Sequence, residues 1–179
     1  MSDLAGGMDA FIGISDDRLA HMRAVAYRAM ELGVEVFHVK QSRARELFAV
    51  GFLHDFAYAF SVDQRDHEHL GGEILRGMGL RDWEAIFYHG DPDVEDMSDE
   101  LLILNIADMQ TNGRGERVSF SERLADIAHR YGEDSEQYQR AAELVARIHA
   151  ELSARNIHPA EVGEDSDPYF KTRDTTSST

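Results

Sequence analysis

The chain has 179 residues, and 34 acidic side chains against 18 lysines and arginines give it a formal net charge of −16. That field repels polyanions and argues against long DNA or RNA as a partner, although a bound cation could reverse the sign in one pocket and admit a small phosphorylated substrate. The length fits one domain with a sizeable core, and the absence of cysteine excludes disulfides and thiolate metal ligands.

Helical patterns follow one another along nearly the whole chain. Apolar residues recur at helical spacing, and Ser, Asp or Gly stands where most of these helices would begin or end. Ser119 with Glu122 forms the sequence pattern of a capping box. The expected helices cover residues 15–33, 42–56, 67–78, 82–89, 98–108, 119–132 and 135–156.

The segments between these helices are short. Residues 34–39 are expected to form a loop or a helical turn, and the two glycines around Arg114 predict a turn, with a small hairpin as far as Val118. The sequence therefore predicts an all-α fold, a single-domain helical bundle of about six to seven helices. Its expected parts are an N-terminal segment 1–9, a helical domain 10–158 and a flexible acidic and polar tail 159–179.

Neither targeting nor membrane insertion is indicated by the sequence. Residues 1–13 do not combine a basic region with an apolar run, so they do not resemble a signal peptide. No apolar stretch approaches the ~20 residues that span a bilayer. We therefore expect a cytoplasmic protein that does not bind membranes.

Ionisable side chains interrupt two apolar segments. His54 and Asp55 stand inside the run FLHDF at residues 52–56, and Asp108 ends the run LLILNIAD at residues 101–108. Buried without partners, such groups would cost several kcal/mol, so a compensating partner is expected. A cation held by His and Asp side chains from several helices would satisfy them together.

Further histidines on neighbouring helices enlarge this candidate metal site. Six ligands are too many for one cation that must leave room for a substrate, but they fit two cations that share the carboxylate of Asp55. Two ions ~3.5–4 Å apart can hold a bridging hydroxide and clamp a phosphoryl group. Histidine and carboxylate ligands suit Fe, Mn, Co, Ni or Zn better than Ca or Mg. The predicted ligands are His21, His54, Asp55, His67, His89 and Asp108, with Asp55 as the catalytic residue.

The order of these residues resembles the HD superfamily of metal-dependent phosphohydrolases. The matching contexts are HMRAV at residues 21–25, GFLHD at 51–55, HEHLGGEIL at 67–75, AIFYH at 85–89 and LNIAD at 104–108. The similarity extends over about residues 19–109. It implies an HD-type helical domain that cleaves a phosphate ester or anhydride of a small substrate with the help of two divalent transition-metal ions.

The five contexts together imply a dinuclear member, similar to the small bacterial branch that includes a diadenosine tetraphosphate hydrolase. The chain lacks three features of other branches: a lysine shortly after the His-Asp pair, the acidic pair of guanosine tetraphosphate hydrolases, and the Gly-Tyr-Pro extension of cyclic dinucleotide phosphodiesterases. The identity of the substrate therefore does not transfer. Nucleotides are the expected class, because the proteins that this chain resembles mostly act on them.

Several alternatives stay open at this point. His69 competes with His67 as the ligand from the third helix. Arg114 and Tyr58 are candidate substrate-binding residues, but they could equally form a solvated turn and a packing contact. A di-iron oxygenase with the same ligand set and a non-catalytic nucleotide-binding protein are alternatives to the hydrolase. The oligomeric state is also open, a homodimer included.

Overall fold

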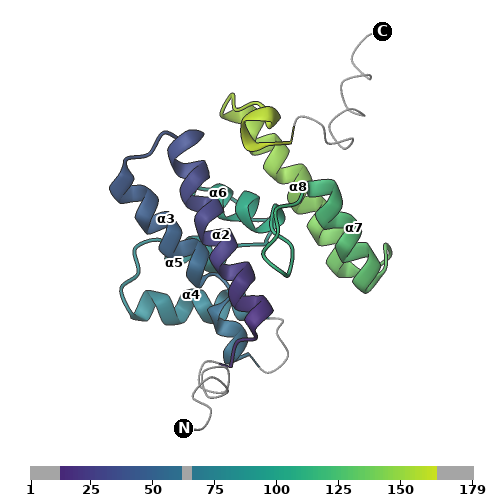
Figure 1. Cartoon of the computed structure of the whole chain (residues 1–179), viewed down its shortest axis with the longest axis horizontal. Coiled ribbons are helices and arrows are strands. Elements are labelled where there is room, and N and C mark those ends of the chain that lie inside the picture. The colour runs from purple at the N-terminus through teal and green to yellow at the C-terminus, as the bar shows by residue number, and fades with distance from the viewer. Residues whose placement is uncertain (1–12, 62–65, 165–179) are drawn as a thin grey trace, which may run out of the picture.

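The computed structural model describes residues 13–61 and 66–164, and over this part of the chain the fold is all-α. The described residues form seven α-helices, two short 3-10 helices and no strand (Figure 1). The α-helices are α2 (Asp16–Glu35), α3 (Gln41–Leu53), α4 (His67–Gly77), α5 (Trp83–Phe87), α6 (Asp99–Met109), α7 (Phe120–Tyr131) and α8 (Glu136–Ala154); the 3-10 helices are η1 (Phe56–Ala59) and η2 (Pro159–Val162).

Four predicted N-caps are confirmed. The side chains of Ser15, Ser98, Ser119 and Ser135 each accept a hydrogen bond from a backbone N–H in the first turn of α2, α6, α7 and α8. Ser119 and Glu122 form the complete capping box. These local signals therefore place the starts of four helices correctly, because each satisfies donors that the helix itself leaves open.

Two predicted helix ends are wrong, each for a reason that lies outside the local sequence. Gly33 does not end the first helix, which continues to Glu35. A Cβ at Gly33 would lie 2.5 Å from Leu47 Cδ1, so this glycine serves close packing between α2 and α3. The second helix ends at Leu53 rather than at residue 56, and His54 and Asp55 form the turn that leads into η1.

The helix starts at Ser42, Asp66 and Asp82 differ from the prediction only in their caps. α3 begins at Gln41 with Lys40 in the N-cap position, so Ser42 is not the cap. Asp66 and Asp82 do precede α4 and α5, but neither side chain makes a capping hydrogen bond.

Helix α2 runs through the middle of the fold and packs against α3 on one side and α6 on another (Figure 1). Gly51 of α3 makes this approach possible, because a Cβ there would lie 2.8 Å from the Cα of Ala26. Helices α7 and α8 lie side by side and close the other flank of α6. The core between these layers is fully buried at Val25, Leu102, Phe120 and Ile148.

The ordered helical domain extends beyond the expected boundary at residue 158. Pro159–Val162 forms η2, and Val162 and Glu164 are buried. Arg28 of α2 donates to the carbonyl oxygen of Val162 over 3.0 Å, and Gln110 donates to the same oxygen over 2.7 Å. Residues 159–164 therefore pack against the bundle instead of belonging to the tail.

The remaining parts of the expected N-terminal segment and tail lie outside the described residues. This concerns residues 1–9 and 165–179. Within residues 13–61 and 66–164, no helix combines the length and the apolar composition that crossing a bilayer requires.

Candidate metal centre

Five elements bring the six predicted ligands to one place. The second turn of α2 carries His21, and the turn after α3 carries His54 and Asp55. His67 is the first residue of α4, and His89 follows α5 by two residues. Asp108 stands in the last turn of α6. All are buried except Asp108, whose side chain is 20% exposed and therefore opens the centre toward solvent.

Asp55 lies at the middle of this cluster, with a different pair of histidines at each of its carboxylate oxygens. Oδ2 lies 3.7 Å from Nε2 of His21 and 3.3 Å from Nε2 of His54. Oδ1 lies 3.0 Å from Nε2 of His67 and 3.7 Å from Nε2 of His89. Two groups that could each hold a metal ion therefore share this one carboxylate: His21, His54 and Asp55, and Asp55, His67 and His89.

Asp108 joins the first of these groups from α6. Its Oδ1 lies 3.0 Å from Nε2 of His21 and 3.9 Å from Nε2 of His54. A cation placed among these nitrogens would therefore have a second carboxylate within reach. The first group is thus the more oxygen-rich half of the cluster.

Backbone carbonyls orient three of the four imidazole rings. Nδ1 of His21 lies 3.0 Å from the carbonyl oxygen of Asn112, and Nδ1 of His54 lies 2.7 Å from that of Gly51. Nδ1 of His89 lies 2.6 Å from the carbonyl oxygen of Ile86. A carbonyl can only accept, so Nδ1 carries a proton in each case, and in the neutral ring Nε2 then has the lone pair that a metal ion binds.

This tautomer makes the cluster fit a metal ion. A neutral imidazole cannot donate from Nε2 to a carboxylate, and the buried Nε2 atoms of His21 and His54 have no hydrogen-bond partner within residues 13–61 and 66–164. A metal cation could be coordinated by these nitrogen atoms and by the carboxylate oxygens together. Histidine whose other ring nitrogen is held by a carbonyl is the usual arrangement of a metal ligand. The residues present therefore fit the divalent ions expected from the sequence.

The electrostatics of the metal-free cluster keep both carboxylates ionised. Burial alone would raise the pKa of Asp55, but in the absence of metal a proton on Nε2 of His54, His67 or His89 stabilises the carboxylate, and these histidines hold that pKa well below its usual range. Burial likewise acts to raise the pKa of Asp108, and His21 and Arg123 outweigh it and lower the pKa. The centre therefore presents two negative charges to a cation.

One known family has a sequence profile that matches the part of the chain that contains this cluster. The sequence profile of the HD domain matches residues 18–113, more than half of the chain. The chain belongs to the HD domain family. Members of this family are generally metal-dependent hydrolases. No significant match was found among curated proteins or among solved structures.

His67 and His69, the two histidines of the segment HEHLGGEIL at residues 67–75, have different surroundings in the structure. His67 is buried in the cluster, with Nε2 3.0 Å from Asp55. His69 is exposed, and its ring packs against Phe87 with the ring centroids 4.5 Å apart. The geometry therefore places His67, and not His69, among the potential ligands.

Arg18 and Tyr58 flank the Asp55 side of the cluster. The guanidinium of Arg18 donates to Oδ2 of Asp55 and lies over the Tyr58 ring, 4.0 Å from its centroid. The Tyr58 ring is also 4.0 Å from the ring of His67, centroid to centroid. Burial and the charge of Asp55 raise the pKa of Tyr58, which keeps its hydroxyl protonated. Tyr58 thus lies beside the centre, and its role in substrate binding stays a prediction.

The loop after α6 supports His21 from outside the cluster. Its residue Asn112 provides the carbonyl that orients the His21 ring. Gly115 has φ +79°, and a Cβ there would lie 2.7 Å from the carbonyl oxygen of Ala20. Only glycine allows the loop to lie this close to α2. Of the two glycines around Arg114, Gly115 is therefore the one that this contact requires.

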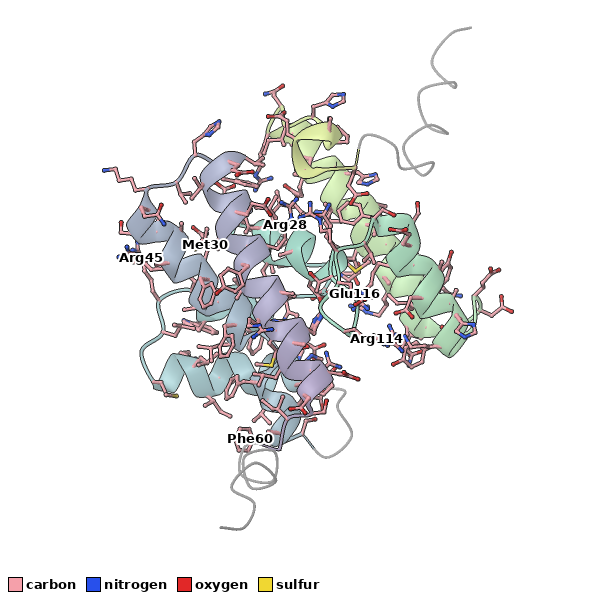
Figure 2. All side chains as sticks on the ribbon, viewed as in Figure 1. Arg28, Met30, Arg45, Phe60, Arg114 and Glu116 are labelled. Carbon is pink, nitrogen blue, oxygen red and sulfur yellow. The ribbon has the colours of Figure 1, made fainter. Side chains whose placement is uncertain are left out.

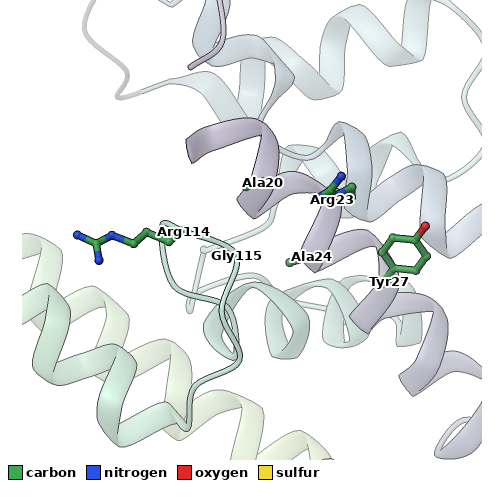
Figure 3. Close-up of a pocket in the computed structure, with 6 residues that line it drawn as sticks. All are labelled: Ala20, Arg23, Ala24, Tyr27, Arg114 and Gly115. Atoms are coloured by element: carbon green, nitrogen blue, oxygen red, sulfur yellow. The ribbon is translucent and has the colours of Figure 1, made fainter. Parts of the chain in front are cut away.

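Arg114 lies on the same loop but is exposed (Figure 2). It borders an open pocket of about 380 Å³ on the outer face of α2, together with Ala20, Arg23, Ala24, Tyr27 and Gly115. Figure 3 shows its guanidinium extending away from Arg23 and Tyr27. Among the described residues, the arginines that form ion pairs with the cluster carboxylates are Arg18 and Arg123.

Sequence reasoning missed both of these arginines. Arg18 precedes His21 by three residues, so helical spacing places the two on one face of α2, and this signal could have been used. Arg123 comes from α7, and nothing in the local sequence relates it to Asp108. Its position depends on how α7 packs beside the end of α6.

Proposed function

We propose that this protein is a metal-dependent phosphohydrolase that cleaves a phosphate ester or anhydride of a small substrate. The observation that carries the proposal is the position of Asp55, whose two oxygens face two different pairs of histidines. One or two divalent ions held there would supply a water acidified by coordination and positive charge for the phosphoryl oxygens. Membership of the HD domain family supports the same class of reaction.

The protein's own residues would orient the substrate and balance its charge. Asp55 would be a ligand in both potential ion-binding groups, and Asp108 would add a ligand to the group that contains His21. Arg18 would contact a phosphoryl oxygen, because it already lies against this carboxylate edge. The protonated hydroxyl of Tyr58 can donate a hydrogen bond to the same group.

The remainder of the substrate has space beside His89. A cavity of about 170 Å³ is lined there by Glu68, His69, Phe87, His89, Gly90, Asp91 and Arg140. The exposed ring of His69 and the ring of Phe87 could contact an apolar or aromatic leaving group. Nucleotides, the class suggested by the resemblance to other HD proteins, are therefore the first compounds to test.

A phosphate-release screen tests this function. The metal-loaded protein is incubated with nucleoside mono-, di- and triphosphates, dinucleoside polyphosphates and sugar phosphates, and inorganic phosphate is measured before and after a phosphatase treatment that reveals shortened products. Turnover that disappears on chelation and returns with added metal supports the proposal. The proposal fails if no compound is cleaved, and oxygen consumption with an organic substrate would move the assignment to a di-iron oxygenase.

A further inference from the structure

Arg123 is held against the metal centre by an anchored helix start. It lies in the first turn of α7, which Ser119 caps. Phe120 is fully buried, and its backbone N–H donates to Oε2 of Glu164 over 3.2 Å. Leu124, the next residue, is part of the core. The backbone that carries Arg123 is therefore fixed by the cap, by the buried Phe120 and by the core contact of Leu124.

The guanidinium is mostly buried and poorly paired. Its side chain is 12% exposed, and its Nη2 lies 3.9 Å from Oδ1 of Asp108. Its Nη1 lies 3.6 Å from Oδ2 of Asp126. Both distances exceed a hydrogen bond, and the buried Nε and Nη1 have no hydrogen-bond partner among the described residues. Leaving such donors unpaired costs free energy that an oxyanion ligand would recover.

The position of Arg123 complements that of Arg18. Oδ1 of Asp108 is also the atom that lies 3.0 Å from Nε2 of His21. Arg18 contacts Oδ2 of Asp55, the oxygen that faces His21 and His54. Both guanidiniums therefore border the same half of the metal centre, one beside each carboxylate. A ligand bound at this half would meet two arginines.

The charges around this half indicate what kind of ligand fits. Arg18 and Arg123 together cancel the charges of Asp55 and Asp108. Glu68, whose Oε2 lies 3.2 Å from Nδ1 of His67, and Asp126, whose Oδ2 lies 3.6 Å from Nη1 of Arg123, each add one negative charge. One divalent ion then balances these charges, and a second ion leaves the centre positive. Such a site favours a phosphoryl group with two negative charges over one with a single charge.

We propose that Arg123 binds the phosphoryl group of the substrate and, with Arg18, selects a terminal, dianionic phosphate over a phosphodiester. The inference rests on the proposed phosphohydrolase function and deepens it. Arg123 lies beyond residues 18–113, the part of the chain that matches the HD domain, so this contact comes from the chain's own C-terminal helices.

Binding of inorganic phosphate to the metal-loaded protein tests this role without turnover. Calorimetry would compare the wild type with Arg123→Met, Arg123→Lys and Arg130→Met. Arg130 is the matched control, because it lies on α7 and also pairs with Asp126 but is 41% exposed. Arg123→Met should weaken phosphate binding by about 10- to 100-fold, the effect of one charge-assisted hydrogen bond. Arg123→Lys should recover part of the affinity, and Arg130→Met should leave it unchanged.

Metal content and thermal stability separate this role from a structural one. Arg123→Met should keep the wild-type metal content, and the metal-free variant should still unfold in one cooperative thermal transition, although it loses a charge that stabilises the Asp108 carboxylate. Wild-type phosphate affinity in Arg123→Met would overturn the proposal. So would a matching loss of metal, or a metal-loaded wild type that binds no phosphate.

A comparison of a phosphate monoester with a phosphodiester as substrates is the second part of the test. With aryl phosphates as probes, kcat/KM should fall more for the monoester than for the diester in Arg123→Met. An equal loss for both would contradict the selection of a dianion. If the wild type cleaves neither probe nor any compound in the screen but binds phosphate through Arg123, the hydrolase assignment fails while the binding site stands.

Discussion

His67 and Asp55 meet with 3.0 Å between Nε2 and Oδ1, and this contact joins the start of α4 to the turn after α3. It places the histidine on the oxygen that also faces His89, away from the oxygen that faces His21 and His54. The pair therefore belongs to one of the two potential ion-binding groups, and its removal should affect that group first.

Substitution of His67 and of His69 should have opposite outcomes. His67→Ala should release the ion held with Asp55 and His89, because one of three ligands in that group is lost. His69→Ala should keep the full metal content, because its ring lies exposed against Phe87. Elemental analysis of both purified variants measures this. No metal loss in His67→Ala would show that His67 is not a ligand, and equal loss in the two variants would contradict the distinction between His67 and His69.

Gly51 should not tolerate a side chain. In Gly51→Ala the new Cβ would meet the backbone of Ala26 at 2.8 Å, so α2 and α3 would have to move apart. We expect a loss of about 1–3 kcal/mol in the free energy of unfolding, measured by urea denaturation. Gly51 also provides the carbonyl that orients His54, so metal affinity should fall as well.

Gly77→Ala is the matched control for this change. Gly77 ends α4 and is exposed, and among the described residues no atom would lie within 4 Å of a Cβ added there. Alanine there should leave stability unchanged or raise it by about 0.4–1 kcal/mol. A Gly51→Ala variant as stable as Gly77→Ala would contradict the tight contact between α2 and α3.

The fold was predictable from the sequence wherever local chemistry decides the structure. Serine caps at Ser15, Ser98, Ser119 and Ser135 mark helix starts through hydrogen bonds to nearby backbone, and the expected all-α architecture is confirmed. Gly33 misled the prediction, because its role is decided by Leu47 on another helix. The residues after Pro159 were likewise misread, because the carbonyl oxygen of Val162 accepts hydrogen bonds from Arg28 and Gln110, which are far away in the sequence.

The sequence predicted the His and Asp residues of the candidate site but not the arginines beside them. The motifs name residues that the structure does bring together, since burial of His and Asp in apolar runs requires partners. The arginines were not found, because an arginine side chain is long and its sequence position does not indicate where its guanidinium lies. Arg114 was chosen from its loop, yet the contacts with Asp55 and Asp108 come from Arg18 and Arg123.

Removal of metal should lower the stability of the fold. An ion that binds only the folded protein adds ~4 kcal/mol to the free energy of unfolding at a thousandfold excess over its dissociation constant. A chelated sample, verified to be free of metal, should therefore melt at a lower temperature than the same sample after metal is restored. Identical melting curves for the two would count against a site at the junction of α2, α3, α4 and α6.

Asp55 should be indispensable for activity. Asp55→Ala removes both oxygens that face the histidine pairs, so hydrolysis of any substrate found in the screen should be abolished. Asp55→Asn keeps the shape but loses the negative charge, so it should retain less metal than the wild type and little activity. Steady-state kinetics at saturating metal tests this, and near-normal kcat/KM in Asp55→Ala would refute the shared-carboxylate arrangement.

The most direct test of the account is the metal stoichiometry of the wild type beside that of Asp55→Ala. Both proteins would be purified without chelator, reconstituted with Fe, Mn, Co, Ni or Zn in turn, and measured by elemental analysis. The account predicts up to two ions per wild-type chain and the loss of binding in both groups when Asp55 is removed, because each contains this residue. A wild type that takes up no stoichiometric metal, or an Asp55→Ala variant that holds as much metal as the wild type, would contradict it.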